Sequence, residues 1–250
     1  MEEEKIFDKL KSYYEILCEK YGEDSILGVY LYGSQNYNFS DEYSDIDAKA
    51  IYVPSLLEIS YNKPMISKEL HTIDGAHIEI KDIRLMAEML KKQNLNFLEI
   101  LFTKYYYENP KYFAINSYWR SIREDISLYD RKRMLISVTA QASNTLKKTS
   151  GKNVAKVMYF YQFFTNLLDK GMSLDKAMKL TNIQKEELLY IKRKENCNID
   201  EIKKATFYLK ELQKKISEFK EDENLRERQL TVDSLFVHSI KKAILIREDW

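Results

Sequence analysis

The stretch from Tyr30 to Val53 constrains the fold of this chain more than any other. It reads YLYGSQNYNFSDEYSDIDAKAIYV, in which a polar loop separates two β-rich runs. The first run ends at Gly33-Ser34, and the second carries Asp45 and Asp47. A glycine after a strand lets the backbone approach a phosphate closely, and a serine hydroxyl and the following amides can donate to it. The pattern predicts two strands joined by a loop that is suited to binding phosphate.

The two aspartates belong to a second pattern. Asp45, Asp47 and Lys49 alternate, so on a strand their side chains share one face. Two carboxylates in that arrangement repel each other unless a cation such as Mg²⁺ lies between them. The residues on the opposite face are apolar and are expected to enter a core layer: Ile46, Ala48 and Ala50.

A β-hairpin is predicted further along the chain. Two short β-rich segments, 70–72 and 77–81, flank Asp74-Gly75, a strong turn signal. If the second segment lies beside the strand with the aspartates, Glu79 becomes a third carboxylate at the same site. Three carboxylates can hold two Mg²⁺ ions about 3.5–4 Å apart, an arrangement that supports in-line phosphoryl or nucleotidyl transfer.

Basic and histidine side chains accompany these carboxylates. Lys49 and Lys81 supply positive charge that could bind the phosphates of a nucleotide. His77 shares the predicted face of Glu79. It is either a contact to a phosphate or to the acceptor, or a partly exposed structural histidine.

A further basic group follows the Thr149–Gly151 turn. Lys152, Asn153 and Lys156 lie at the start of a predicted helix. A helix N-terminus with basic neighbours suits phosphate, either that of a nucleotide or that of a nucleic-acid backbone. A helix start in a charged surface explains the same residues equally well.

Hydrophobic periodicity outlines the remaining elements. The predicted strands span 26–32, 45–53, 70–72 and 77–81. The predicted helices span 3–21, 83–92 (after an N-cap at Asp82), 94–103, 110–124, 131–149, 152–169, 173–180, 184–195, 199–222 and 231–246. The expected organisation is an α/β domain over residues 1–108, followed by an all-helical domain over residues 109–250.

The charge is distributed unevenly between the two parts. The chain is 44% hydrophobic and 13% aromatic, which indicates a folded protein. Residues 1–130 hold 15 basic and 23 acidic side chains, a net charge of −8, whereas residues 131–250 hold 25 and 16, a net charge of +9. The basic half either meets a polyanion or is a lysine-rich helical surface in water.

Other features narrow the class of protein. Cys18 and Cys197 fit no metal-binding or redox spacing, and the start MEEEKIFDKL is unlike a signal peptide. The most apolar run, 157–164, is too short to span a bilayer, and its aromatic side chains are typical of core packing. We expect a soluble, cytoplasmic protein without a membrane partner.

The combined pattern of Gly-Ser, Asp-x-Asp and a later acidic strand resembles the nucleotidyltransferase superfamily typified by DNA polymerase beta. More closely, GSQNYNFSDEYSDIDAKAIYVPS followed by IEIKDIRLMAEMLKKQNLNFLEILFT is similar to the RlaP-type predicted nucleotidyltransferases of bacteria and phages. The segment LLYIKRKEN over 188–196 resembles a helical landmark of that group. The resemblance is specific over residues 28–103 and looser from residue 131 onward.

The resemblance implies a nucleotidyltransferase palm with a mixed sheet, which binds a nucleoside triphosphate and Mg²⁺ or, alternatively, Mn²⁺. By position, Gly33 and Ser34 match the triphosphate-contacting signature. Asp45 and Asp47 match the metal-binding catalytic pair, and Glu79 matches the third catalytic, metal-binding acid. The superfamily most often has aspartate in place of Glu79, so the expected geometry of the second metal changes.

The resulting hypothesis is a Mg²⁺-dependent enzyme that transfers a nucleoside monophosphate to an acceptor hydroxyl and releases pyrophosphate. The basic half favours RNA as the acceptor, in end modification or repair. The alternatives are transfer to a protein or a small molecule, and a non-catalytic regulator that binds nucleotide or nucleic acid. The sequence specifies neither the nucleotide base nor the oligomeric state.

Overall fold

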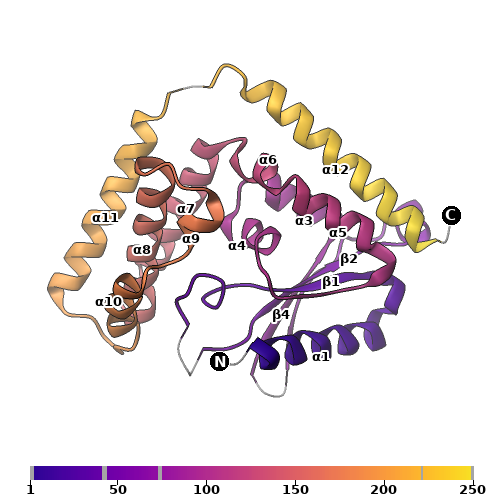
Figure 1. Ribbon diagram of the computed structural model, residues 1–250, viewed down its shortest axis with the longest axis horizontal. Coiled ribbons are helices and arrows are strands. Elements are labelled where there is room, and N and C mark those ends of the chain that lie inside the picture. Colours follow the sequence, from indigo (N-terminus) through magenta and orange to yellow (C-terminus); the bar gives the residue numbers. More distant parts are fainter. Residues whose placement is uncertain (1–2, 41–43, 73–74, 221, 249–250) are drawn as a thin grey trace.

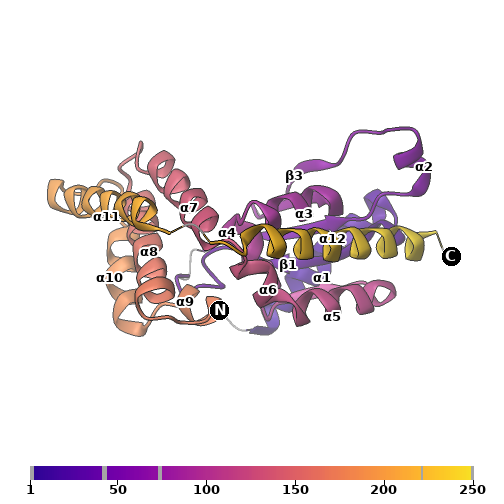
Figure 2. The ribbon, with the colours of Figure 1, turned by 90° about the horizontal axis from the view of Figure 1, so that it is seen from above.

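The computed structural model describes residues 3–40, 44–72, 75–220 and 222–248. The chain is a mixed α/β protein with a five-stranded sheet at one end and a helical region at the other (Figures 1 and 2). The predicted turn between the segments 70–72 and 77–81 includes Asp74, which lies outside the described residues.

The sheet has the strand order β3-β4-β2-β1-β5. Its strands are β1 (Ile26–Leu31), β2 (Ala48–Tyr52), β3 (Ser67–His71), β4 (His77–Asp82) and β5 (Tyr106–Glu108). Strands β2 and β4 are parallel, and the other neighbours are antiparallel. The sheet is therefore mixed, as the resemblance implies.

The register of β2 and β4 confirms that the hairpin lies beside the aspartate-bearing segment. Lys49 is directly opposite Glu79. The alternate residues of both strands, such as Ala48 and Ile78, are buried against the helix α1 (Glu3–Tyr21). The apolar face and the polar face of these strands are thus the ones that alternation predicts.

The other side of the sheet is covered by α3 (Ile83–Lys91), α5 (Phe113–Ser121) and α12 (Leu225–Arg247), opposite α1 (Figure 1). Asp82 caps α3, because its carboxylate accepts a hydrogen bond of 2.9 Å from the Arg84 amide. The remaining helices are η1 (Glu23–Ser25), α2 (Leu56–Ser60), α4 (Leu95–Leu98), η2 (Glu99–Leu101), η3 (Pro110–Tyr112), α6 (Arg123–Leu128), α7 (Arg131–Thr145), α8 (Gly151–Phe164), the π-helix η4 (Thr165–Asp169), α9 (Leu174–Met178), α10 (Asn182–Lys192) and α11 (Ile199–Glu218).

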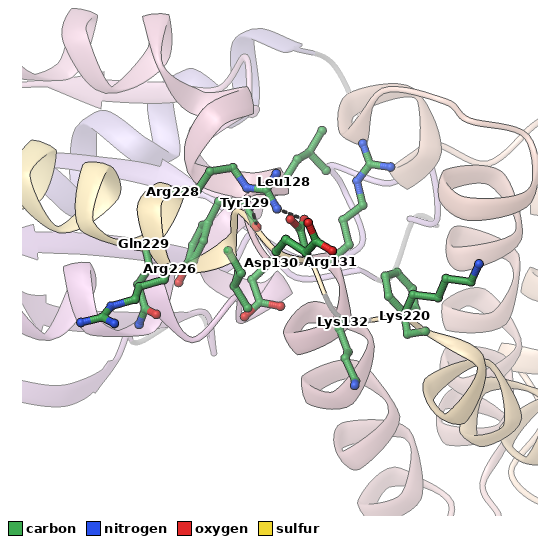
Figure 3. Close-up of a pocket in the computed structure, with 13 residues that line it drawn as sticks. Leu128, Tyr129, Asp130, Arg131, Lys132, Lys220, Arg226, Arg228 and Gln229 are labelled. Carbon is green, nitrogen blue, oxygen red and sulfur yellow. Dashed lines mark hydrogen bonds and ion pairs between the residues drawn. The ribbon is translucent and has the colours of Figure 1, made fainter.

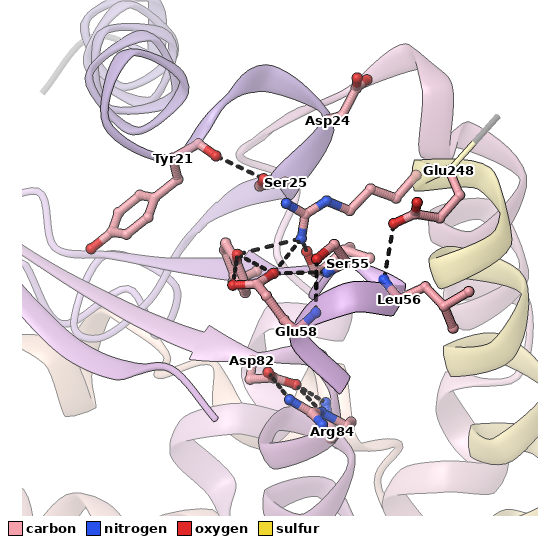
Figure 4. A network of polar contacts seen from close by, with 12 residues as sticks. Tyr21, Asp24, Ser25, Ser55, Leu56, Glu58, Asp82, Arg84 and Glu248 are labelled. Atoms are coloured by element: carbon pink, nitrogen blue, oxygen red, sulfur yellow. Dashed lines mark hydrogen bonds and ion pairs between the residues drawn. The ribbon is translucent and has the colours of Figure 1, made fainter. Parts of the chain in front are cut away.

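The last helix returns to the sheet. The Arg247 guanidinium donates to the carbonyl of Val53 and, at 3.0 Å, to the carboxylate of Glu58. Glu248 accepts a hydrogen bond of 2.9 Å from the amide of Leu56 (Figure 4). One apolar core continues from the sheet into the helical region, and the division at residue 108 stays a prediction. None of the helices in the described ranges has the length and hydropathy that a membrane span requires.

Several elements of the structure differ from the prediction. Strand β2 begins at Ala48 and not at Asp45, because β1 ends at Leu31 and the chain then turns away, which leaves the backbone around Asp45 without a partner strand. Strand β5 was not predicted, since its three residues are too short for a periodic pattern. The helix expected over 110–124 is interrupted at Ile122, because periodicity reports the buried face and not the continuity of hydrogen bonds.

Candidate functional site

A cavity of about 720 Å³ lies where the loop after β1 meets helices α8 and α10. The segment before β2 contributes Asp45 and Asp47 to its lining, and the loop after β1 contributes Gly33 and Ser34. The structure therefore brings together the predicted phosphate-binding and metal-binding residues of the opening stretch. A volume of this size is typical of small-molecule sites, which occupy about 300–1,000 Å³.

The loop after β1 is held by a buried carboxylate. Gly33 has φ of 89°, a left-handed conformation that favours glycine. Its amide donates a hydrogen bond of 2.9 Å to Glu99, and the Asn36 side chain donates to the same oxygen at 3.3 Å. The loop then closes through a bond of 2.9 Å from the Phe39 amide to the Ser34 carbonyl. These bonds fix the position of the Gly-Ser pair at the cavity.

The two aspartates at the cavity oppose each other electrostatically. Burial raises the pKa of Asp47, and the charge of Asp45 raises it further. His77 and Lys152 lower the same pKa but do not reverse the shift. A half-buried carboxylate with a raised pKa beside a second carboxylate is a position where a bound cation is stabilising.

Glu79 has other partners in the structure. It forms ion pairs with Lys49 through one carboxylate oxygen and with Lys81 through the other, at 3.1 Å. Lys49 is buried, and its ammonium lies 4.0 Å from the centre of the Tyr32 ring. These pairs lower the pKa of Glu79 against the opposing effect of burial. Glu79, Lys49 and Lys81 therefore form a cluster beside the cavity and do not line it.

The predicted residues at the start of α8 lie in two different depressions of the surface. Lys152 and Lys156 line the cavity together with the aspartates. Asn153 lies instead in a neighbouring polar depression of about 600 Å³, where its side chain donates a hydrogen bond of 3.2 Å to the Lys148 carbonyl. His77 is outside the cavity lining and lies 3.0 Å from the Tyr32 hydroxyl.

Sequence reasoning missed the contribution of α10. Lys192 and Arg193 line the cavity, and they belong to the segment LLYIKRKEN. The Lys192 ammonium donates to the Ser44 hydroxyl at 3.0 Å and to the Phe39 carbonyl at 3.2 Å. These bonds connect α10 to the segment that precedes Asp45.

Aromatic side chains form a further part of the lining. Tyr37 and Tyr159 pack with ring centres 4.9 Å apart, and Phe39 stacks on Tyr159 at 6.1 Å. Tyr159 and Phe160 are buried, as a core assignment predicts, yet both also border the cavity. The wall that they form is apolar beside an otherwise charged site.

A second cavity of about 640 Å³ lies between the α6–α7 junction and the start of α12 (Figure 3). Its lining mixes charges of both signs, and Arg228 donates to the Tyr129 carbonyl at 3.3 Å. Asp130 there caps α7 through a bond of 2.8 Å from the Arg133 amide. Tyr129, Asp130, Asp222 and Arg228 there all have partners within the protein. The first cavity, in contrast, is lined by residues that the sequence singles out, so it is the better candidate site.

No protein-family model matches the chain, and a search of curated proteins finds no match.

Proposed function

We propose that the protein is a Mg²⁺-dependent nucleotidyltransferase, with the sheet and its flanking helices as the palm. The observation that carries the proposal is the composition of the larger cavity. A Gly-Ser loop, two aspartates, basic side chains from α8 and the end of α10, and aromatic rings line the same cavity. A nucleoside triphosphate has the matching parts: an anionic tail, a bound cation and an aromatic base.

Asp45 and Asp47 suit a hard cation, because Mg²⁺ prefers carboxylate oxygens. Burial, and after it the charge of Asp45, raise the pKa of Asp47, and a bound cation would offset both effects. When bound, Mg²⁺ would neutralise charge on the triphosphate and lower the pKa of the acceptor hydroxyl. Ser34 and Lys152 would bind the phosphate tail. In the reaction, the acceptor oxygen forms a bond to the α-phosphorus while the bond to pyrophosphate breaks.

The basic helices support RNA as the acceptor. Lys147 and Lys148 border the polar depression that Asn153 also lines, and Lys152, four positions after Lys148, lines the cavity. A basic surface thus extends along the start of α8 from outside the cavity into it. A phosphodiester backbone on this surface would bring a terminal hydroxyl toward the aspartates.

The ion pairs of Glu79 favour a second candidate function, a non-catalytic protein that binds nucleotide. Both carboxylate oxygens of Glu79 are engaged by lysines, so the third acid of a two-metal site is occupied in this arrangement. A catalytic role requires that Glu79 exchanges at least one lysine for a metal ion.

The test is incubation of the purified chain with each α-labelled nucleoside triphosphate, Mg²⁺ or Mn²⁺, total RNA and total protein. We expect label in RNA, and we expect Asp47→Asn to lower transfer at least about 100-fold. Asp8→Asn, at an exposed aspartate of α1, is the matched control and keeps the rate.

The fraction that carries the label separates the candidates. Label in protein or in small molecules replaces RNA with another acceptor. Absence of transfer, together with Mg²⁺-dependent nucleotide binding that Asp47→Asn abolishes, favours the regulator. Transfer that Asp47→Asn leaves unchanged contradicts the site assignment.

A further inference from the structure

A cluster of metal-ligating side chains lies on the β3–β4 hairpin, outside the cavity. Strands β3 and β4 are antiparallel, with His71 directly opposite His77. Because side chains alternate along a strand, Glu69, two residues before His71, lies on the same face as His71. One ligating atom from each of Glu69, His71 and His77 lies within 4.8 Å of the others.

The geometry is close to that of a bound ion. The Nε2 atom of His77 is 3.3 Å from a carboxylate oxygen of Glu69, and the two imidazole rings have centres 5.2 Å apart. Ligand atoms around a tetrahedral ion with bonds of about 2.0–2.1 Å are roughly 3.3 Å apart. His71 and Glu69 are exposed, so small side-chain rotations would bring their ligating atoms to this separation.

The hydrogen bond behind His77 is the kind that metal-bound histidines make. Its Nδ1 atom lies 3.0 Å from the Tyr32 hydroxyl. When Nδ1–H donates to that oxygen, the lone pair of Nε2 is left for a metal on the side of Glu69. A partner of this kind fixes the ring and raises the affinity of its other nitrogen.

We propose that Glu69, His71 and His77 form a binding site for one divalent transition-metal ion such as Zn²⁺. Two imidazoles and one carboxylate select zinc-like ions, whereas Mg²⁺ prefers oxygen ligands alone. The site is therefore distinct in chemistry from the Asp45 and Asp47 pair. Three protein ligands leave a fourth position for water or an anion.

The site would also couple to the nucleotide cavity. The backbone of His77 is hydrogen-bonded to Asp47, and Tyr32, whose hydroxyl lies 3.0 Å from His77, lines the cavity. An ion on His77 would therefore fix the start of β4 beside Asp47 and add positive charge there.

The experiment is calorimetric titration of the full chain, without a histidine tag, with Zn²⁺ in the absence of nucleotide and Mg²⁺. We expect one ion per chain. His71→Ala and His77→Ala each weaken binding at least about tenfold. His238→Ala is the matched control, because His238 is the remaining histidine of the sequence and lies on α12. It should leave the affinity unchanged.

Titration of the His71→Ala and Asp45→Asn variants with Co²⁺ distinguishes this site from the aspartate pair. The absorption of tetrahedral Co²⁺ should disappear in His71→Ala and persist in Asp45→Asn. Absence of Zn²⁺ binding, or binding that His71→Ala leaves unchanged, overturns the proposal. Because these experiments measure metal binding alone, their outcome does not depend on whether the protein catalyses nucleotidyl transfer.

Discussion

The carboxylate of Glu99 accepts a hydrogen bond of 2.9 Å from the amide of Gly33, which places a buried acid directly behind the Gly-Ser loop. Burial raises the pKa of Glu99 to about 7, although hydrogen bonds from Tyr37, Gly33 and Asn36 act in the opposite direction. The group that positions the loop therefore changes its charge near neutral pH.

Replacement of this acid should change how stability depends on pH. Since the pKa of Glu99 is higher in the folded state, the folded protein binds more protons between about pH 4.5 and 7. The unfolding free energy contributed by Glu99 consequently falls as the pH rises through this window. Glu99→Gln removes this decrease. The unfolding free energy of the variant, relative to that of the wild type, should therefore rise by up to about 3 kcal/mol between pH 4.5 and 8. Urea denaturation at several pH values measures it.

The matched control for this series is Glu15→Gln, at an exposed glutamate of α1. Its unfolding free energy should run parallel to that of the wild type. If Glu99→Gln also runs parallel, Glu99 does not titrate in this range.

The contact between α8 and α10 depends on a glycine. A Cβ atom at Gly151 would collide with the carbonyl oxygens of Ile191 and Lys194. Gly151→Ala should therefore lower the unfolding free energy by about 1–3 kcal/mol, although alanine is otherwise the better helix former. Urea denaturation measures the unfolding free energy. Ser150→Ala is the control, because the side chain of this N-cap residue makes no capping hydrogen bond and its removal should change the unfolding free energy little.

The neighbourhood of β2 and β4 was predictable because it follows from local alternation. Successive side chains of a strand point to opposite faces of the sheet. Once β2 and β4 are known to be neighbours, Lys49 and Glu79 are therefore expected on the same face. The roles within that pair were not predictable. A carboxylate and two lysines on one face can bind a nucleotide and its metal, or they can bind one another, and the choice depends on side-chain conformations.

The parts of the cavity contributed by Glu99 and Lys192 were not predicted for another reason. Glu99 interrupts an apolar helical stretch, and a lone charge there can equally face water; nothing local shows that it meets Gly33. Lys192 reaches Ser44 across 148 positions of the chain. Contacts over such separations arise from helix packing, which periodicity does not encode.

Neutralising one aspartate should separate stability from ligand binding. Because burial and Asp45 raise the pKa of Asp47, its charged form opposes folding. Asp47→Asn should raise the unfolding free energy of the ligand-free protein by about 0.5–1 kcal/mol. Nucleotide and Mg²⁺ should raise the unfolding free energy of the wild type by a further amount, about 2.7 kcal/mol when the ligand concentration is one hundred times Kd. The variant should lose this increase. Thermal unfolding with and without ligand measures both effects, and Asp8→Asn should match the wild type in each.

The basic surface at the start of α8 should determine how RNA binding depends on salt. Each phosphate neutralised on a single strand adds about −0.7 to the slope of log affinity against log salt concentration. Replacing Lys147, Lys148 and Lys152 together by glutamine should therefore make the slope less steep by about 2 and weaken binding at low salt. Fluorescence anisotropy with a labelled single-stranded RNA measures both quantities.

A control with the same change in net charge isolates the position of these lysines. Three exposed lysines of α11 serve for it: Lys203, Lys210 and Lys214. If the helical half attracts RNA only through its overall charge, both triple variants lose the same amount of slope. If RNA follows the start of α8 toward the aspartates, the α11 variant loses less of the slope than the variant of Lys147, Lys148 and Lys152, because salt screens charges that do not contact the phosphates.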